Sequence, residues 1–241
     1  MQADRFDVYD IDGTLTIPGH DLWHLCTKNL CADKGLFDRQ VAQWKADIQN
    51  GADSFDRSLA MMKSGLTLLG NGIDSERIVD EAKRLAGNLI DEGFVWREAI
   101  NFLKSRLRTG RTAVLSTTNY HEVAVGFLLA LNLRGWIDEA ELKTIVVSGS
   151  KIDWNSRSVV HFNMGNNKVM GLVDALGISE AAVKARIDYA FGDDPLGNDQ
   201  ELLAIAPHPY VIRNEKHSDL NLPDRVKLVT WSDVAQQHQR H

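Results

Sequence analysis

Two carboxylates at the end of an apolar segment are the residues of this sequence best placed to do chemistry. Asp10 and Asp12 end the strand predicted over residues 5–10 and directly precede Gly13. Residues two apart in an extended chain point to the same side, and two neighbouring carboxylates repel each other. A hard divalent cation such as Mg²⁺ takes oxygen ligands and keeps open positions for a phosphate. The segment therefore predicts a Mg²⁺ site, and a strand end with two solvated acids is the simpler alternative.

Further polar residues occur where other predicted elements begin or end. Hydroxyl and amide residues end a strand predicted over residues 112–116, a lysine starts a helix predicted over 167–176, and an acidic loop over 192–199 follows a strand predicted over 187–191. In chain order the main candidates are Ser116, Thr117, Lys168, Asp193, Asp194 and Asp199. Because open parallel sheets bind ligands at the carboxyl ends of their strands, we expect these residues on one rim.

This inventory suits a phosphate monoester, because it combines acids for a metal with hydroxyls, helix-start amides and one ammonium for an anion. Each element alone also has a simpler explanation. The cluster at 116–119 can be a helix cap, Lys168 can be a solvated surface lysine, and the loop at 192–199 can be a turn rich in turn-forming residues.

The elements that must position these side chains follow an α/β order. Helices are predicted over residues 99–107, 121–131 and 167–176, and strands over 5–10, 112–116, 143–147, 187–191, 209–213 and 226–230, followed by a short polar tail. Residues 145–152 and 158–162 flank a turn at 153–156 and predict a hairpin. The order indicates a doubly wound parallel sheet.

About a hundred residues separate the first two predicted strands. Within this interval, apolar residues recur at the three- to four-residue spacing typical of a helix. Ile78, Ala82, Leu85 and Leu89 illustrate this spacing. We therefore predict two domains, a helical insertion over residues 18–92 and an α/β core formed by residues 1–17 and 93–241.

Composition excludes several classes of function. The 241 residues include 27 basic and 33 acidic side chains, a formal charge of −6, with no long Lys/Arg run, so nucleic acid is not an expected partner. No apolar stretch is long enough to span a bilayer, and residues 1–5 leave no room for a signal sequence before the first strand. We expect a cytoplasmic protein without a membrane partner. Cys26 and Cys31 are expected to be packing residues.

Four motifs resemble, in order, those of the haloacid dehalogenase-like hydrolase superfamily, on the phosphoserine-phosphatase-like branch with a helical cap. They are Asp10-Ile11-Asp12-Gly13-Thr14, Val114-Leu115-Ser116, Lys168, and Gly192-Asp193 with Asp199. The resemblance covers residues 5 to about 213 and implies a Rossmann-like core with the helical insertion as its cap.

The resemblance also implies roles. Asp10 would be the nucleophile and Asp12 the general acid and base, with its backbone carbonyl on the metal. Lys168 and Ser116, with Thr117, would hold the phosphate.

The implied metal site has one ambiguity. Mg²⁺ would be bound at Asp10, Asp12 and Asp193, and Asp199 would orient Lys168 or a metal-bound water. Relatives commonly separate the last two acids by four or five residues, whereas Asp193 and Asp199 are six apart. Asp194 therefore stays an alternative to Asp193 as ligand.

The implied activity is Mg²⁺-dependent hydrolysis of a small phosphate ester through an aspartyl-phosphate. Asp12 with Thr14 favours a phosphatase over a dehalogenase, because a departing halide needs no proton. Transfer to another acceptor is one alternative, and a catalytically weak phosphate-binding or interaction protein, suggested by the irregular fourth motif, is the other. Early cap residues His20, Asp21 and Trp23 are candidates for substrate binding, and a phosphoserine- or histidinol-phosphate-like substrate is the resulting hypothesis.

Overall fold

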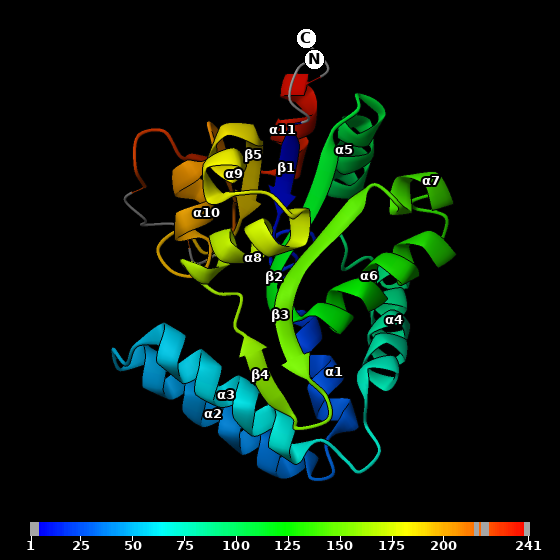
Figure 1. The fold of residues 1–241 in the computed structure, drawn as a ribbon, viewed down its shortest axis with the longest axis vertical. Coiled ribbons are helices and arrows are strands. Elements are labelled where there is room, and N and C mark those ends of the chain that lie inside the picture. The colour runs from blue at the N-terminus through cyan, green and yellow to red at the C-terminus, as the bar shows by residue number, and fades with distance from the viewer. Residues whose placement is uncertain (1–4, 215–216, 218–221, 239–241) are drawn as a thin grey trace.

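Seven strands form a single sheet in the computed structural model, which describes residues 5–214, 217 and 222–238 (Figure 1). The strands are β1 (Phe6–Tyr9), β2 (Thr112–Tyr120), β3 (Ile145–Asp153), β4 (Ser158–His161), β5 (Ile187–Gly192), β6 (His208–Ile212) and β7 (Lys227–Val229). Their order is β4-β3-β2-β1-β5-β6-β7, and every neighbouring pair is parallel except the β3–β4 hairpin. This confirms the predicted doubly wound sheet and the hairpin.

Helices cover both faces of the sheet because the central strands are apolar on both sides. Val8 belongs to a buried cluster with residues of α8 (Asn167–Leu176), α9 (Glu180–Arg186) and α10 (Gln200–Ile205). Tyr9 belongs to the opposite cluster, with α5 (Arg97–Arg108), α6 (His121–Leu133) and α11 (Trp231–His238). A further short helix, α7 (Glu139–Leu142), precedes β3. Because side chains alternate along β1, the strand contributes residues to two hydrophobic layers, one on each face of the sheet.

The segment between β1 and α5 is helical, as the sequence predicts. It contains α1 (Leu22–Leu30), α2 (Lys34–Gln49), α3 (Ser54–Leu68) and α4 (Ser75–Asp91). Each of these helices starts at an aspartate whose side chain accepts a hydrogen bond from a backbone N–H of the first turn: Asp21, Asp33, Asp53 and Asp74. Four similar caps explain why a segment with modest apolar content still forms four defined helices.

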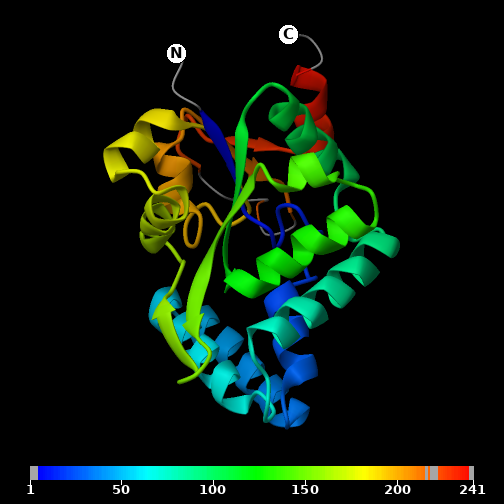
Figure 2. The same ribbon diagram turned by 45° about the vertical axis from the view of Figure 1, so that its right-hand side comes forward.

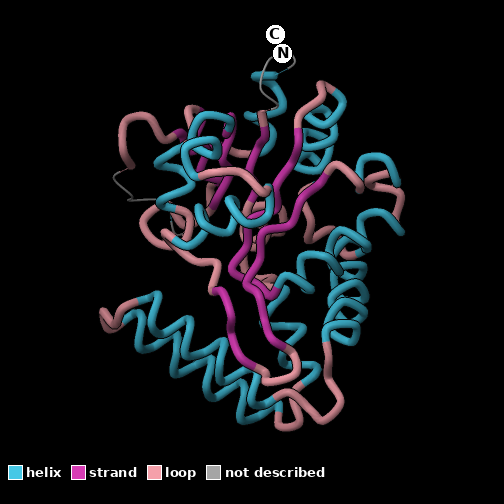
Figure 3. Tube along the Cα trace, in the orientation of Figure 1, coloured by secondary structure: helices cyan, strands magenta, loops and turns pink. Residues whose placement is uncertain are grey.

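Backbone hydrogen bonds join the two ends of the insertion. Ile17 N–H donates to the Phe94 carbonyl, and Trp96 N–H donates to the Leu15 carbonyl, both at 2.9 Å. Beyond this base, α2 and α3 lie past the end of the sheet, where β3 and β4 extend toward them (Figure 3). Arg157 in the β3–β4 turn donates to the carbonyls of Leu69 and Gly70, at 2.8 and 2.7 Å. The hairpin therefore fastens the insertion to the core.

The insertion also packs directly on the core through α4. Figures 1 and 2 show α4 running alongside α6. A Cβ added at Gly126 of α6 would lie 2.7 Å from the Val79 carbonyl and 2.8 Å from Lys83 N, so the glycine permits a close helix contact. One hydrophobic cluster runs through both parts. The division into domains at residues 18 and 92 stays a prediction.

Several segments differ from the sequence-based prediction. The short helices α7, α9 and α10 were not predicted, and two further differences concern β2 and the last described residues. Strand β2 continues to Tyr120, beyond the expected end at Ser116, and its pairing with β3 shifts register between those two residues. Residues 231–238 form α11, where a polar tail was expected. Trp231 and Val234 are buried, and Trp231 Nε1 donates to the Thr14 carbonyl at 2.8 Å. Two apolar residues were too weak a pattern to reveal this contact.

Two observations bear on the expectations from composition. Cys26 and Cys31 are buried free thiols, and burial raises their pKa to about 12 and about 11. Within the part of the chain that the structure describes, no helix combines the length and apolar character needed to cross a bilayer.

A buried ion cluster lies at the amino ends of the central strands. Arg106 of α5 donates to both carboxylate oxygens of Asp7, at 2.6 and 3.2 Å, and to Asp188 at 2.8 Å. Asp7 is fully buried, and Asp188 nearly so. Asp188 has a second partner in Arg111, at 3.2 Å. The cluster ties α5 to β1 and β5 at the end of the sheet opposite the polar motifs.

We expect Arg106→Met to lower the free energy of unfolding by about 3–5 kcal/mol, because it leaves Asp7 buried without its guanidinium. Urea denaturation measures the loss. Lys184→Met is the matched control, since Lys184 pairs with Glu180 on the surface and such pairs contribute about 1 kcal/mol or less. Equal losses in the two variants would contradict the assigned role.

Candidate active site

Lys168 lies at the centre of the polar residues that follow the strands. Its side chain is fully buried on α8. Its ammonium donates to Asp10 Oδ1 at 2.9 Å, to Asp199 Oδ1 at 2.6 Å and to the Ser116 carbonyl at 3.4 Å. Burial alone would lower the Lys168 pKa, but Asp10 and Asp199 outweigh it and raise the pKa above its usual range. The three predicted strand-end motifs therefore meet at one charged nitrogen.

Three carboxylates gather around this lysine. Oxygens of Asp10, Asp193 and Asp199 lie within 4.8 Å of one another. Burial raises the pKa of Asp10 well above its usual value, Lys168 opposes this, and the charges of Asp199 and Asp193 add to it. With one ammonium against three carboxylates, the group carries two excess negative charges when all are ionised. Such a hard oxygen donor set matches what Mg²⁺ prefers.

The loop after β5 arranges its acids by backbone contacts. Asp199 Oδ2 accepts hydrogen bonds from the backbone N–H groups of Asp193 and Asp194, at 3.0 and 3.1 Å. Asp194 itself is exposed, and its Oδ2 accepts from Asn198 N–H at 2.7 Å. Asp193, and not Asp194, thus belongs to the acidic group beside Asp10. The unusual spacing of six residues is accommodated by a loop that folds back on Asp199.

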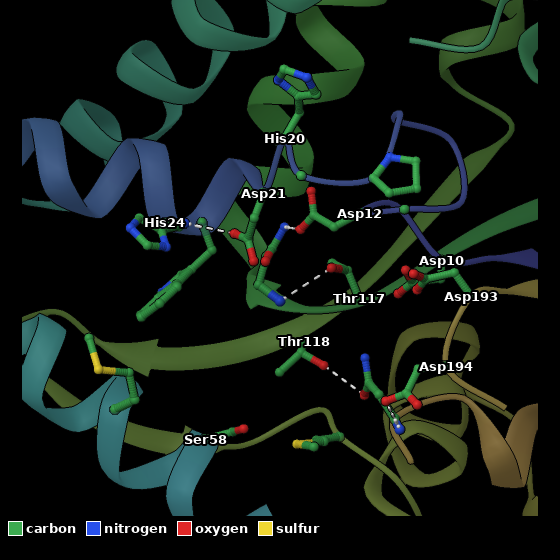
Figure 4. Close-up of a pocket in the computed structure, with 18 of the residues that line it drawn as sticks. Asp10, Asp12, His20, Asp21, His24, Ser58, Thr117, Thr118, Asp193 and Asp194 are labelled. Atoms are coloured by element: carbon green, nitrogen blue, oxygen red, sulfur yellow. Dashed lines mark hydrogen bonds between the residues drawn. The ribbon is translucent and has the colours of Figure 1, made fainter. Parts of the chain in front are cut away.

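Asp12 lies apart from that acidic group (Figure 4). Its Oδ1 accepts from Leu22 N–H of α1 at 3.0 Å, and its Oδ2 accepts from Asn119 Nδ2 at 2.8 Å. The Asp12 carboxylate is therefore not grouped with that of Asp10, because β1 ends at Tyr9 and the chain turns before Asp12. Metal binding at Asp12 stays a prediction. Burial, followed by the charges of Asp21 and Asp10, raises the pKa of Asp12 well above its usual range.

The two predicted phosphate-binding hydroxyls, those of Ser116 and Thr117, have different surroundings. They lie where the pairing of β2 with β3 begins to shift register. Thr117 lines a cavity next to the acids, together with Thr118 and Asn119. Ser116 Oγ is buried and has no hydrogen-bond partner among the described residues. Its role in phosphate binding stays a prediction.

Asn163 is a supporting residue that sequence reasoning missed. Its buried side-chain amide donates to the Thr117 carbonyl at 2.9 Å and to the Ser148 carbonyl at 2.8 Å. It therefore bridges β2 and β3 where the ladder shifts register. Asn119, which bonds Asp12, was noted only as part of a polar strand end. Neither contact has a local signal, because both partners come from distant parts of the chain.

The cavity beside the acids has a volume of about 660 Å³ and reaches under the insertion. His20, Asp21 and Trp23 all line it. The His20 ring points away from the acids in Figure 4 and stacks on Phe94, with 3.7 Å between ring centroids. Asp21 Oδ1 is used in capping α1, where it accepts from His24 N–H at 2.8 Å.

Comparisons with known proteins identify solved structures with a similar architecture. No protein-family model matches the sequence, and no curated protein matches it. A solved structure of a protein of unknown function from Bordetella pertussis Tohama I aligns with a TM-score of 0.62 at 14% identity, covering 98% of this chain and 96% of that chain. Cytosolic 5′-nucleotidase IIIB bound to cytidine aligns with a TM-score of 0.59 at 13% identity, covering 98% and 86%.

Phosphoserine phosphatase from T. onnurineus aligns with a TM-score of 0.56 at 15% identity, covering 97% of this chain and 94% of that chain. At such identities the likeness concerns the fold. It extends over nearly the whole chain. The chain therefore shares its fold with solved structures of HAD-family phosphatases, phosphoserine phosphatase among them.

Proposed function

We propose that this protein is a Mg²⁺-dependent phosphomonoesterase that hydrolyses a small phosphorylated metabolite through an aspartyl-phosphate. The observation that carries the proposal is the buried Lys168 ammonium, bonded to Asp10 and Asp199 with Asp193 beside them. This group adjoins the cavity that a substrate would enter.

Mg²⁺ would be held by the carboxylates of Asp10 and Asp193, and the resemblance adds the backbone carbonyl of Asp12. When bound, the ion would offset the two excess negative charges and draw charge from the phosphoryl oxygens. The donor set consists of oxygen atoms, which is what such an ion prefers.

Asp10 would attack phosphorus with a carboxylate oxygen, forming an O–P bond as the bond to the leaving oxygen breaks. Lys168 holds the Asp10 carboxylate in place and lowers the repulsion between it and an anionic substrate. Ser116, Thr117 and Lys168 would bind the phosphoryl oxygens, and Thr117 lines the cavity beside the acids. Positioning and charge compensation are the main contributions expected in phosphoryl transfer.

Asp12 would donate its proton to the leaving oxygen and later accept one from the water that hydrolyses the aspartyl-phosphate, releasing inorganic phosphate. Its burial favours the protonated carboxylic acid that the first step needs, and Asn119 with Leu22 N–H fixes its orientation. The same hydrogen bonds suit the carboxylate that remains after the proton leaves.

The rival hypothesis, a catalytically weak phosphate-binding protein, was suggested by the irregular fourth motif. It has less support because Asp199 contacts both Lys168 and the backbone of Asp193 despite the spacing. A phosphotransferase would share every residue named above and differ only in the acceptor. A phosphoserine- or histidinol-phosphate-like substrate stays a hypothesis.

Hydrolysis of p-nitrophenyl phosphate tests the proposed activity. We expect steady turnover with Mg²⁺, loss of activity with EDTA, and recovery when Mg²⁺ is restored. Asp10→Asn should lower kcat by about a thousandfold or more, because the nucleophile is removed. Turnover that survives both EDTA and Asp10→Asn would refute the proposal.

The two adjacent acids of the fourth motif give a sharper test of the metal site. Asp193→Asn should abolish Mg²⁺-dependent turnover, because Asp193 lies in the acidic group. Asp194→Asn, which changes a loop-capping residue, should keep most of the activity. Titration of activity with Mg²⁺ measures both. The reverse result would assign the metal to Asp194.

Gly13 offers a test that removes no carboxylate from the protein. Its φ is +78°, and an added Cβ would fall on the Asp193 carboxylate. Gly13→Ala should therefore displace Asp193 and weaken Mg²⁺ binding, measured by isothermal titration calorimetry. Gly72→Ala is the control, because Gly72 has a φ of +74° and open space around it. Unchanged Mg²⁺ affinity in a folded Gly13→Ala variant would speak against Asp193 as a ligand.

A further inference from the structure

Part of the cavity lining is apolar. Trp23 of α1, Trp44 of α2, and Met61 and Met62 of α3 contribute to it from the insertion. Phe162 and Met164, which follow β4, contribute from the core. Four separate segments thus supply aromatic rings and thioethers to one surface. We call these six residues the apolar wall.

Few charges accompany the apolar wall. Among the described lining residues on α2 and α3, Lys45 is the only one with a charged side chain, and it is exposed. Trp44 Nε1 donates a hydrogen bond to Ser58 Oγ at 3.3 Å. His24, which also lines the cavity, has its pKa lowered by burial and is therefore mainly neutral near pH 7. Asp10 and Asp193 line the same cavity, and the phosphate would bind beside them.

Volume and chemistry together constrain the leaving group. A cavity of about 660 Å³ lies in the range of roughly 300–1,000 Å³ typical of sites for ligands larger than a three-carbon metabolite. A leaving group with both an ammonium and a carboxylate would place charges beside thioethers and rings that cannot pair with them. Asp21 also lines the cavity, but its Oδ1 already accepts from His24 N–H in capping α1. Aromatic groups suit such a wall, because rings pack favourably on other rings and on methionine sulfur.

We propose that the natural substrate is a phosphate monoester whose leaving group carries an uncharged aromatic ring system that packs on the apolar wall. This inference rests on the proposed function, and it selects among small phosphate esters. It disfavours a phosphoserine-like leaving group and keeps Trp23, predicted from the sequence, as one part of a larger ring-binding surface.

Binding of two phosphonates tests the inference without relying on turnover or on leaving-group reactivity. Methylphosphonate carries only the phosphate-like end, and 1-naphthylmethylphosphonate adds a fused ring. With Mg²⁺ present, calorimetry should show the naphthyl compound binding about tenfold tighter or more, because the ring buries apolar surface. Trp44→Ala should remove much of that difference. Leu133→Ala, at an exposed position of α6, should leave it unchanged.

The outcomes separate this inference from the proposed function. If methylphosphonate binds as tightly as the naphthyl compound to the wild-type protein, the aromatic leaving group is refuted while the phosphate site stands. If neither phosphonate binds, the phosphate site fails and this inference fails with it. The wild-type comparison decides the question even if Trp44→Ala does not fold.

Discussion

A buried lysine ammonium joins segments of the chain that are far apart in sequence. Lys168 of α8 has an oxygen acceptor from each of three segments, namely Asp10 after β1, the Ser116 carbonyl of β2 and Asp199 after β5. A buried charge is costly unless it is paired and hydrogen-bonded. This requirement couples the ends of three neighbouring elements of the sheet. The position of Asp193, and with it the acidic group, follows from Asp199.

The sequence predicted those parts of the fold whose signals are local. The apolar alternation before Asp10, the hairpin around residues 153–156 and the helix that starts near Lys168 are each encoded within about ten residues. The helical character of residues 18–92 was equally clear from apolar spacing, whereas the aspartate that caps each of the four helices was recognised only in the structure.

What the sequence could not predict depends on contacts between distant segments. Asn163 bridges two strands whose ladder shifts register, and nothing near it in the sequence indicates that task. The separation of Asp12 from Asp10 depends on Asn119 and on the start of α1. Helix α11 forms because Trp231 packs against the core and bonds the Thr14 carbonyl. In each case the structure depends on contacts between distant segments, which the local sequence pattern does not predict.

Under the proposed function, the insertion would affect both the chemistry and the choice of substrate. Asp12 accepts one hydrogen bond from α1 and another from β2, so the proposed acid is oriented by insertion and core together. The same insertion supplies most of the apolar wall. A substrate that fills the cavity would therefore contact the helices that also position the acid. This arrangement links recognition of the leaving group to the proton it must receive.

The central claim is that Asp10 accepts a phosphoryl group while a divalent ion lies beside it. A crystal structure of the protein with Mg²⁺ and beryllofluoride tests this most directly. We predict beryllofluoride bonded to an Asp10 carboxylate oxygen, with Mg²⁺ between Asp10 and Asp193. An unmodified Asp10 side chain and no ion beside Asp193, in crystals grown with saturating amounts of both, would contradict the account.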